Sequence, residues 1–425
     1  MPDGAATASA PAAAPATGCP IDHDFDPLAP GYLADPYAVA DRVREATPVF
    51  YAPSLDMWVV SRMEDVEAVF SDHETFSGRI VQDPVFPVCD AARAVLSEGF
   101  HPLPVMSNNE PPDHGRIRVH TTKGFSNRRM AVLEPFIRAN AERLVGDMLA
   151  GERPAEFVHA LAFPLPAYTV FRHIGFPDED AEQLKRWCGN RKLFQWGRAT
   201  EAEQVAIAEN MVAYWHYCQE FTDAKLHDLG DDFASDLLRA HLDDPDQLTL
   251  DEVKSVVYGL SFAGHEAVTN LLCNTVRQLL AHREQWEEVC ADPELVTAAV
   301  EETLRYDSSQ ISWRRITKKA AVVGGVEIPE GAKVLLLFAA ANHDPRRFDE
   351  PDRFDIHRAN ARHHISFGKG IHFCLGAGTA RHEARIVLDT LIHMVPSLRL
   401  AEDQDFRVFP NITFRGPEQL WLDWD

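Results

Sequence analysis

One ten-residue stretch, Phe367–Gly376, constrains this chain more than any other, because it presents a single thiol where a turn meets a helix. The segment from Leu375 to Val395 repeats apolar residues at helical spacing, so Cys374 lies at or just before a helix N-terminus. Unpaired backbone N–H groups and the positive end of the helix dipole favour a thiolate there, which is the metal-binding form of cysteine. The glycines allow close backbone approach and positive φ, as a flat cofactor against the loop would require. A buried, inert cysteine is the alternative for any lone thiol.

The pattern F-x-x-G-x-H-x-C-x-G in this stretch resembles the haem-ligand loop of the cytochrome P-450 family, the haem-thiolate monooxygenases. The resemblance implies that Cys374 is the metal ligand of haem b. It also places Phe367, Gly368 and His372 in the cofactor-binding loop. Electron donation from the thiolate would then favour cleavage of the O–O bond. A thiol hydrolase with His372 as the base is a weaker hypothesis, since two positions apart on one loop is a poor arrangement for nucleophile and base.

A structural triad is the second part of the resemblance. Glu302 and Arg305 match the family's E-x-x-R helix motif, and residues three apart share a helix face. The run Asp349–Phe354 resembles the meander that supplies a third group, for which Arg353 is the expected member. Alone, an E-x-x-R pair would more often be a solvated surface pair.

A long helical pattern, roughly Asp251 to His282, carries the third part of the resemblance. It begins with a capping box and would be about 45 to 50 Å long. It resembles the family's distal helix, in which the A-G-x-E turn widens locally where dioxygen and water bind. The resemblance makes Gly264, Glu266 and Ala267 the catalytic positions, with Glu266 delivering protons. Gly264 as a packing contact and Glu266 as a surface carboxylate are the alternatives.

Position 267 departs from the family pattern, which usually has a threonine directly after the acid. This chain has Ala267, and Thr269 lies about 200° further round the helix, so we do not expect it to substitute. A substrate hydroxyl, His265 or an ordered water would then complete the hydrogen-bond network. Otherwise the enzyme would use peroxide better than dioxygen.

Four cationic or donor residues are assigned to the haem propionates by resemblance. The stretch Pro111–Arg118 is similar to the family segment whose His and Arg bind a propionate. Carboxylates that leave water need such partners. The matching positions are His114, Arg118, Arg315 and His372. The sequence leaves open whether Arg314 takes the place of its neighbour Arg315.

A single mainly α-helical domain, residues 23–425, is expected despite a length that would allow two or three domains. The motifs that must meet at one cofactor span His114 to Cys374. Strand patterns are confined to Met57–Ser61, Ala321–Ile328, Lys333–Phe338 and a C-terminal pair, Phe406–Phe409 with Gln419–Trp424. The resemblance implies a helical domain with small sheets at one side and haem between the distal helix and the cysteine loop.

Composition excludes several classes of protein. Residues 1–22 are rich in Ala and Pro and predict a disordered leader. There is neither a signal-peptide pattern nor an apolar run of about 18 residues, which predicts a cytoplasmic protein of the soluble bacterial type. The net charge of −24 disfavours nucleic acid and anionic membranes as partners. Seven irregularly spaced cysteines argue against disulfides or a paired zinc site. We expect a monomer.

A basic segment stands out against this acidic background. The stretch from His114 to Arg129 contains no Asp or Glu, and its Lys and Arg residues are Arg116, Arg118, Lys123, Arg128 and Arg129. With Arg362 and Lys369 they would form a basic patch on the thiolate side of the haem, where an acidic electron donor would dock. A solvated helix face is the alternative.

Three further segments resemble haem domains that in some bacteria are fused to a flavin and iron–sulfur reductase. They are Leu55–Val60, Ala341–Asp344 and Phe414–Pro417. Electrons would therefore come ultimately from NAD(P)H through a ferredoxin or such a reductase. The sequence does not separate a stand-alone enzyme from a haem domain excised from a fusion.

The implied activity is a monooxygenase that inserts one oxygen atom of dioxygen into a small organic substrate by hydroxylation or O-dealkylation. The expected pocket segments are mostly apolar with a few aromatics, which favours a small, neutral, apolar compound, preferably aromatic. These segments are Ile80–Met106, Phe194–Trp196, Leu260–Ala267, Ser309–Ile311 and Ile412–Thr413. A peroxide-driven peroxygenase and a non-catalytic haem sensor or carrier on the same scaffold are the alternatives.

Overall fold

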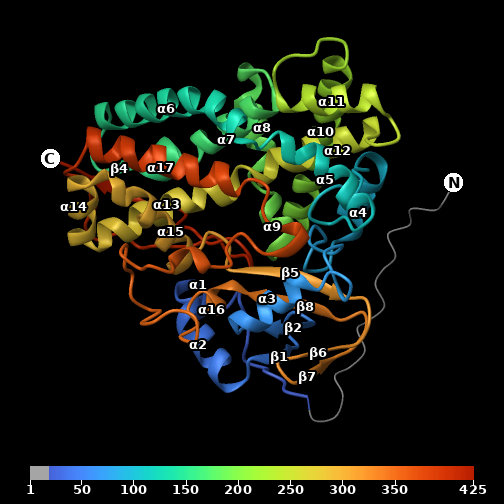
Figure 1. Ribbon diagram of the computed structural model, residues 1–425, viewed down its shortest axis with the longest axis horizontal. Coiled ribbons are helices and arrows are strands. Elements are labelled where there is room, and N and C mark those ends of the chain that lie inside the picture. Colours follow the sequence, from blue (N-terminus) through green and yellow to red (C-terminus); the bar gives the residue numbers. More distant parts are fainter. Residues whose placement is uncertain (1–18) are drawn as a thin grey trace.

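The computed structural model describes residues 19–425 (Figure 1). Most of the predicted leader, residues 1–18, lies outside the described residues. The last part of that leader pairs with the first strand: Ile21 forms a parallel bridge with Tyr51, and the Asp22 N–H donates to the Tyr51 carbonyl at 3.0 Å. The chain therefore joins the fold slightly earlier than residue 22.

Helices dominate the described residues, as predicted, and in Figure 1 most of them lie above the largest sheet. The α-helices are α1 Pro30–Ala34, α2 Pro36–Ala46, α3 Met63–Ser71, α4 Asp90–Gly99, α5 Asp113–Lys123, α6 Asn127–Ala150, α7 Pro164–Ile174, α8 Ala181–Cys188, α9 Arg191–Trp196, α10 Glu201–Lys225, α11 Phe233–Asp243, α12 Leu250–Ala263, α13 Glu266–Ala281, α14 Arg283–Ala291, α15 Val296–Tyr306, α16 Phe338–Ala341 and α17 Ala377–Met394. Shorter turns of helix are η1 Val158–Ala162, η2 Asp178–Asp180, η3 Pro293–Leu295, η4 Ala361–His363 and η5 Gly370–His372.

The strands form one five-stranded sheet, in the order β1-β2-β8-β5-β3, and two smaller sheets, β4-β10-β9 and β6-β7. Their bounds are β1 Val49–Ala52, β2 Met57–Val60, β3 Phe76–Ser77, β4 Ala155–Glu156, β5 Ser312–Thr317, β6 Ala321–Val323, β7 Val326–Ile328, β8 Lys333–Leu337, β9 Arg399–Leu400 and β10 Trp421–Asp423. The predicted strands at β2, β6, β7 and β8 are present.

The C-terminal strand prediction was wrong in its pairing. Trp421 in β10 pairs with Glu156, and Leu422 pairs with Ala155 and with Leu400. The segment Phe406–Phe409 contributes only an isolated bridge from Val408 to Pro417. Partners more than 250 residues away along the chain, as in β4, leave no mark on the local apolar pattern.

β5 matters for the site because it carries two adjacent arginines. It runs antiparallel to β8, with Arg314 opposite Leu335 and Arg315 opposite Val334. Successive side chains of a strand point to opposite faces of the sheet. Arg314 and Arg315 therefore point in opposite directions.

The predicted distal helix is interrupted at its A-G-x-E turn. α12 begins at a capping box, in which Thr249 and Glu252 each bind the other's backbone N–H, and ends at Ala263. α13 begins at Glu266, so the break covers Gly264 and His265. A Cβ added at Gly264 would lie 2.6 Å from a methyl carbon of Val170 on α7. Only glycine lets the two helices approach so closely here.

α17, the helix after the cysteine loop, packs against α6, α13 and α15 (Figure 1). Its apolar face shares one buried cluster with these helices, through residues such as Ala384, Val387 and Leu391. This packing fixes the position of the preceding loop relative to the distal helix. Among the described helices, none combines the length and apolarity that crossing a bilayer takes.

Candidate active site

The cysteine loop folds as a tight turn against α3. The Cys374 N–H donates to the Phe367 carbonyl at 2.9 Å, three residues before α17 begins. Gly368 and Gly370 have φ of +67° and +73°, which side chains rarely adopt. A Cβ at Gly370 would lie 2.6 Å from the Phe70 carbonyl oxygen. Glycine is therefore required at position 370 both by its positive φ and by this close approach.

Cys374 is exposed to solvent although protein surrounds much of it. Burial raises the pKa of its thiol, while the Gly376 N–H and the positive charges of Arg118 and Arg381 lower it. The other described cysteines are buried or half-buried. Cys374 is thus the one described thiol presented openly, with cations and a backbone donor near its sulfur.

The four residues assigned to the propionates lie together beside this loop. The rings of His114 and His372 are 4.4 Å apart, and the Arg118 guanidinium donates to the Phe373 carbonyl at 2.6 Å. His114 Nε2 and His372 Nδ1 are buried and find no hydrogen-bond partner among the described residues. Burial, with Arg315 and His114 nearby, lowers the pKa of His372 to about 3. Two unpartnered imidazole nitrogens among cations fit a pair of carboxylates, so these residues suit the haem propionates.

The neighbouring arginines have different surroundings, which decides between them. Arg314 donates to the carbonyls of Val81 and Asp83, at 3.1 and 2.6 Å. Arg315 is buried over the Phe70 ring, 4.7 Å from its centroid, and its charge acts on His372. Arg315, and not Arg314, therefore lies in the same cluster as His372 and His114.

The distal helix presents small residues to an open face. Ala263 is exposed, and Gly264 and Ala267 are half-buried, although the residues between them are buried. An exposed thiol at Cys374 and an open helix face without bulky side chains are both features that a flat cofactor requires.

Glu266 and its neighbours face inward from the break. The Glu266 side chain is 5% exposed, and its carboxylate forms an ion pair with Lys192 on α9. The His265 Nε2 lies 3.1 Å from the Phe163 carbonyl, and burial lowers its pKa to about 4. The Thr269 hydroxyl donates to the His265 carbonyl at 3.2 Å. The His265 Nε2 and the Thr269 hydroxyl proton are therefore both already engaged by backbone carbonyls.

The triad prediction needs one correction. Glu302 and Arg305 form a fully buried bidentate pair, at 2.7 and 2.8 Å. The third side chain is Arg358, whose Nε donates to Glu302 at 3.1 Å. Arg353, the predicted member, contributes only its carbonyl oxygen to Arg305, and its side chain is 63% exposed. The path of the meander, not its spacing, brings Arg358 inward.

A second buried carboxylate next to this triad was missed. Glu301 accepts from Arg381 on α17 at 2.6 and 3.1 Å, and lies 3.4 Å from the His364 ring. Burial alone would raise the pKa of Glu301, but His364 and Arg381 outweigh it and lower the pKa to about 2. The pair ties α15 to the helix that follows the cysteine loop. Glu301 falls on the apolar, buried face that the α15 pattern predicts. A charged residue at such a position indicates a buried partner, and this was the sequence signal that could have revealed the pair.

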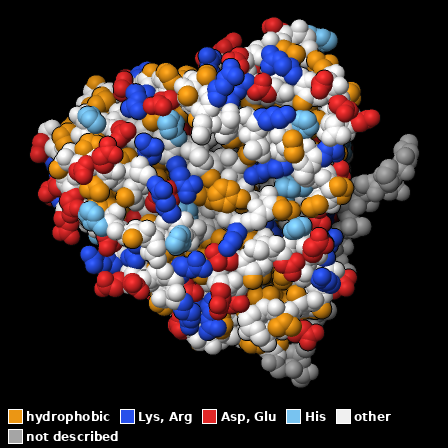
Figure 2. Space-filling view, in the orientation of Figure 1, with side chains coloured by type: hydrophobic (Ala, Val, Ile, Leu, Met, Phe, Trp, Pro, Cys, Tyr) orange, Lys and Arg blue, Asp and Glu red, His pale blue; other side chains and the backbone are white. Residues whose placement is uncertain are grey.

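The predicted basic patch is smaller than expected. Arg116 pairs with Asp113 and Glu252, and Arg129 pairs with Asp231 and Asp236. Their charges are therefore neutralised. The remaining members, Arg118, Lys123, Arg128 and Arg362, have no ion pair among the described residues, and Lys369 lies 3.2 Å from Glu67. Figure 2 shows Lys and Arg side chains gathered near the start of α17.

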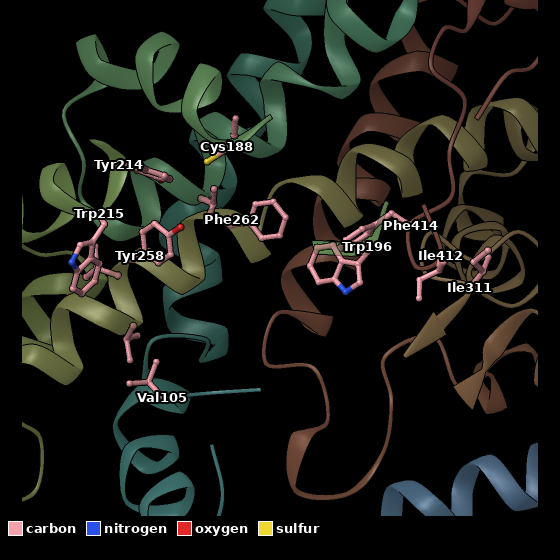
Figure 3. Packing of buried hydrophobic residues seen from close by; sticks show 14 of the residues in the cluster. Val105, Cys188, Trp196, Tyr214, Trp215, Tyr258, Phe262, Ile311, Ile412 and Phe414 are labelled. Carbon is pink, nitrogen blue, oxygen red and sulfur yellow. The ribbon is translucent and has the colours of Figure 1, made fainter. Parts of the chain in front are cut away.

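The segments expected to line a substrate pocket come together in one apolar cluster. Trp196 stacks on Phe262 at 6.0 Å between ring centroids and meets Phe414 edge-on at 5.0 Å. The Ile412 N–H donates to the Trp196 carbonyl at 3.0 Å. Figure 3 shows Ile311 and Ile412 beside Trp196 and Phe414.

Known proteins resemble the chain over nearly all of its length. The family model for Cytochrome P450 matches residues 45–395. Cytochrome P450 107B1 of Saccharopolyspora erythraea is 37% identical over 372 residues, which are 86% of this chain and 89% of the relative.

Two solved structures share the fold closely. The cytochrome P450 CREJ in complex with (4-ethylphenyl) dihydrogen phosphate has a TM-score of 0.91 and 38% identity, and the match covers 95% of this chain and 100% of that one. An intact type IV self-sufficient cytochrome P450 monooxygenase has a TM-score of 0.93 and 36% identity, covering 97% of this chain and 55% of that one.

Proposed function

Since the chain belongs to the cytochrome P450 family of haem-dependent monooxygenases, we propose that it inserts one oxygen atom of dioxygen into a small aromatic compound by hydroxylation or O-dealkylation. The family and the mainly helical fold predicted from the sequence are confirmed. The reaction consumes substrate, dioxygen, two electrons and two protons, and yields the oxygenated product and water. When bound, the haem supplies the activation of dioxygen.

The observation that carries the proposal is the meeting of one open thiol and an unpaired cationic cluster at a single loop. Cys374 offers the anionic sulfur ligand. The buried nitrogens of His114 and His372, with Arg118 and Arg315, offer donors for two carboxylates. Haem has both features, an iron that takes a thiolate and two propionates.

An aromatic substrate is supported by the surroundings of the distal helix. Phe262, Trp196 and Phe414 provide aromatic surface in the cluster beside it. The relative CREJ is known in complex with an aryl phosphate. Aromatic rings pack favourably edge-on or offset-stacked against such side chains.

Glu266 is proposed to deliver protons. It is buried at the helix break, next to the open face of Ala263 and Gly264, and its partner Lys192 is 17% exposed. A buried carboxylate paired with a partly exposed cation supports a proton route from solvent to the oxygen side of the site. Ala267 leaves the last hydrogen bond to water or a substrate hydroxyl.

Electrons are proposed to come from NAD(P)H through a ferredoxin or a flavin and iron–sulfur reductase. The unpaired cations near the cysteine loop form a docking surface for an acidic donor. One close structural relative is described as self-sufficient. The expected monomeric state and cytoplasmic location stay predictions.

A peroxide-driven peroxygenase is the second candidate, and Ala267 is the observation that favours it. If peroxide is the natural oxidant, Ala267→Thr lowers peroxide-driven turnover and raises dioxygen-driven turnover for every substrate. If dioxygen is the natural oxidant, Ala267→Thr raises the product formed per electron donor consumed only for substrates that lack a hydroxyl. For substrates that have one, it weakens binding. Product per electron donor consumed, and per peroxide consumed, separates the two.

Oxygen-isotope labelling tests the main proposal. Holoprotein with ferredoxin, its reductase and NAD(P)H is given 18O2 and a panel of small alkyl and alkoxy aromatics. We expect hydroxylated products to carry one 18O atom, and dealkylation to release an aldehyde. Haem binding with no consumption of reducing equivalents on any member would point instead to a sensor or carrier.

A further inference from the structure

Arg191, the first residue of α9, is a buried cation without a counter-charge. It is 8% exposed, and no carboxylate among the described residues lies within ion-pair distance of it. Its neighbour Lys192 is less buried and has the Glu266 carboxylate as partner. Lys192 is therefore already paired with a carboxylate, whereas Arg191 has no counter-charge and can still bind an anion.

The contacts of Arg191 hold its guanidinium but leave hydrogen-bonding capacity unused. The guanidinium lies over the rings of Tyr258 and Phe262, 4.9 and 4.7 Å from their centroids. Its Nη2 donates to Gln82 Oε1 at 3.1 Å. The buried Nε has no acceptor among the described residues, and neither has the Tyr258 hydroxyl.

Gln82 is held so that its oxygen faces the arginine. Its amide nitrogen donates to the Ser107 hydroxyl at 3.0 Å, and Gln195 donates to its carbonyl and its side-chain oxygen at 2.8 and 3.1 Å. The Arg191 side chain is thereby fixed before any ligand arrives. A preorganised donor loses little conformational entropy on binding.

Burying a lone cation is unfavourable, and aromatic rings and one amide oxygen compensate for it only in part. An incoming oxyanion would satisfy the free Nε–H and neutralise the charge. The guanidinium fork matches the geometry of carboxylate and phosphate oxygens.

The position along the distal helix suits a substrate group. The two rings under the guanidinium, Tyr258 and Phe262, lie six and two residues before Gly264, at axial distances of about 9 and 3 Å. A para-substituted benzene ring spans a distance within that range. An acidic group at Arg191 would therefore leave the opposite substituent near the helix break and Glu266.

We propose that the substrate is an aromatic acid, and that Arg191 binds its carboxylate or phosphate group. This inference rests on the proposed monooxygenase function and replaces the neutral substrate that the sequence favoured. Binding the acid at one end orients the other end toward the oxygen site.

Calorimetric titration of the holoprotein tests it with three ligands: 4-ethylbenzoate, 4-methylphenyl phosphate and the neutral methyl 4-ethylbenzoate. Arg191→Met removes the cation. Gln82→Glu keeps the arginine but supplies an internal carboxylate at the oxygen that now lies 3.1 Å away. Arg186→Met is the matched control, because Arg186 is an exposed arginine on the adjacent helix α8.

We expect at least one anion to bind the parent more tightly than the ester does. Arg191→Met and Gln82→Glu should each weaken that anion about 10- to 100-fold and leave the ester within about twofold, while Arg186→Met changes neither. Whichever anion is affected identifies the group as carboxylate or phosphate. If Arg191→Met yields no holoprotein, Gln82→Glu decides alone.

The inference is overturned if the ester binds the parent as tightly as both anions, or if the variants weaken anion and ester alike. The second result would make Arg191 a packing element between two aromatic rings. Tight, Arg191-dependent binding without oxygenated product would uphold this inference and contradict the proposed function instead.

Discussion

Lys192 on α9 forms an ion pair with Glu266, the first residue of α13, across the break in the distal helix. Their side chains are 17% and 5% exposed, so the pair is largely shielded from water but open at the lysine end. The buried carboxylate at the helix break is thus joined to solvent through one cation.

Glu266→Gln should slow product formation about 100-fold, because the amide keeps the shape but cannot transfer a proton. Haem content and substrate affinity should stay close to parental values. Steady-state turnover, with its solvent isotope effect, checks this. Turnover within twofold of the parent would remove Glu266 from proton delivery.

The triad correction predicts a contrast between two arginines on one meander. Arg358→Met should leave the buried Glu302 charge with one partner fewer and destabilise the fold by about 3 to 5 kcal/mol, with little holoprotein recovered. Arg353→Met, which removes an exposed side chain, should behave like the parent. Denaturant unfolding and haem content per chain compare the two. If Arg353→Met were the destabilised variant and Arg358→Met behaved like the parent, Arg353 would be the third member of the triad after all.

Glu301 predicts a pH dependence of stability. Its folded-state pKa of about 2 lies below its ordinary value of 4.5, so the ionised carboxylate stabilises the fold above pH 4.5. That contribution, about 3 kcal/mol, is lost as the pH falls through about 2. The stability difference between the parent and Glu301→Gln should therefore shrink as the pH falls from 5 toward 2. A difference that is constant over this range would contradict the assignment.

The reduced basic patch predicts which charges guide the electron donor. Arg128→Glu should slow reduction by an acidic ferredoxin and weaken its salt dependence, without changing substrate affinity. Arg186→Glu, at an exposed arginine on α8 without an ion pair among the described residues, is the matched control. Arg129→Glu should chiefly destabilise the fold, because it breaks the pairs with Asp231 and Asp236. Equal reduction rates for Arg128→Glu and the parent across ionic strengths would place the donor elsewhere.

Local patterns carried much of what the sequence predicted. The apolar spacing of the distal helix and its capping box at Thr249 were legible, because each depends on neighbours a few residues away. The glycines and cysteine before α17 were legible for the same reason. The interruption at Gly264 and His265, where only a local widening was expected, was not legible. The adjacent Arg314 and Arg315 were separated only by the sheet, which points them to opposite faces.

Contacts between distant segments could not be predicted. Arg358 rather than Arg353 reaches Glu302 because the meander folds back on α15, and spacing does not encode that path. Lys192 meets Glu266 across 74 residues, and Arg129 meets Asp236 across 107. From the sequence alone, a Lys or Arg is expected to be exposed to solvent. Only the folded structure shows the distant carboxylate that pairs with it.

The absorption spectrum of the reduced, carbon monoxide-bound protein tests the central claim most directly. The open thiol of Cys374 and the propionate cluster beside it predict the red-shifted Soret band of a thiolate-ligated haem in the parent. Cys374→Ser should lose that band while it keeps much of the fold, since serine cannot supply a comparable soft anionic ligand. A parent without the red-shifted band, or a Cys374→Ser variant that retains it, would contradict the assignment of Cys374 as the haem ligand.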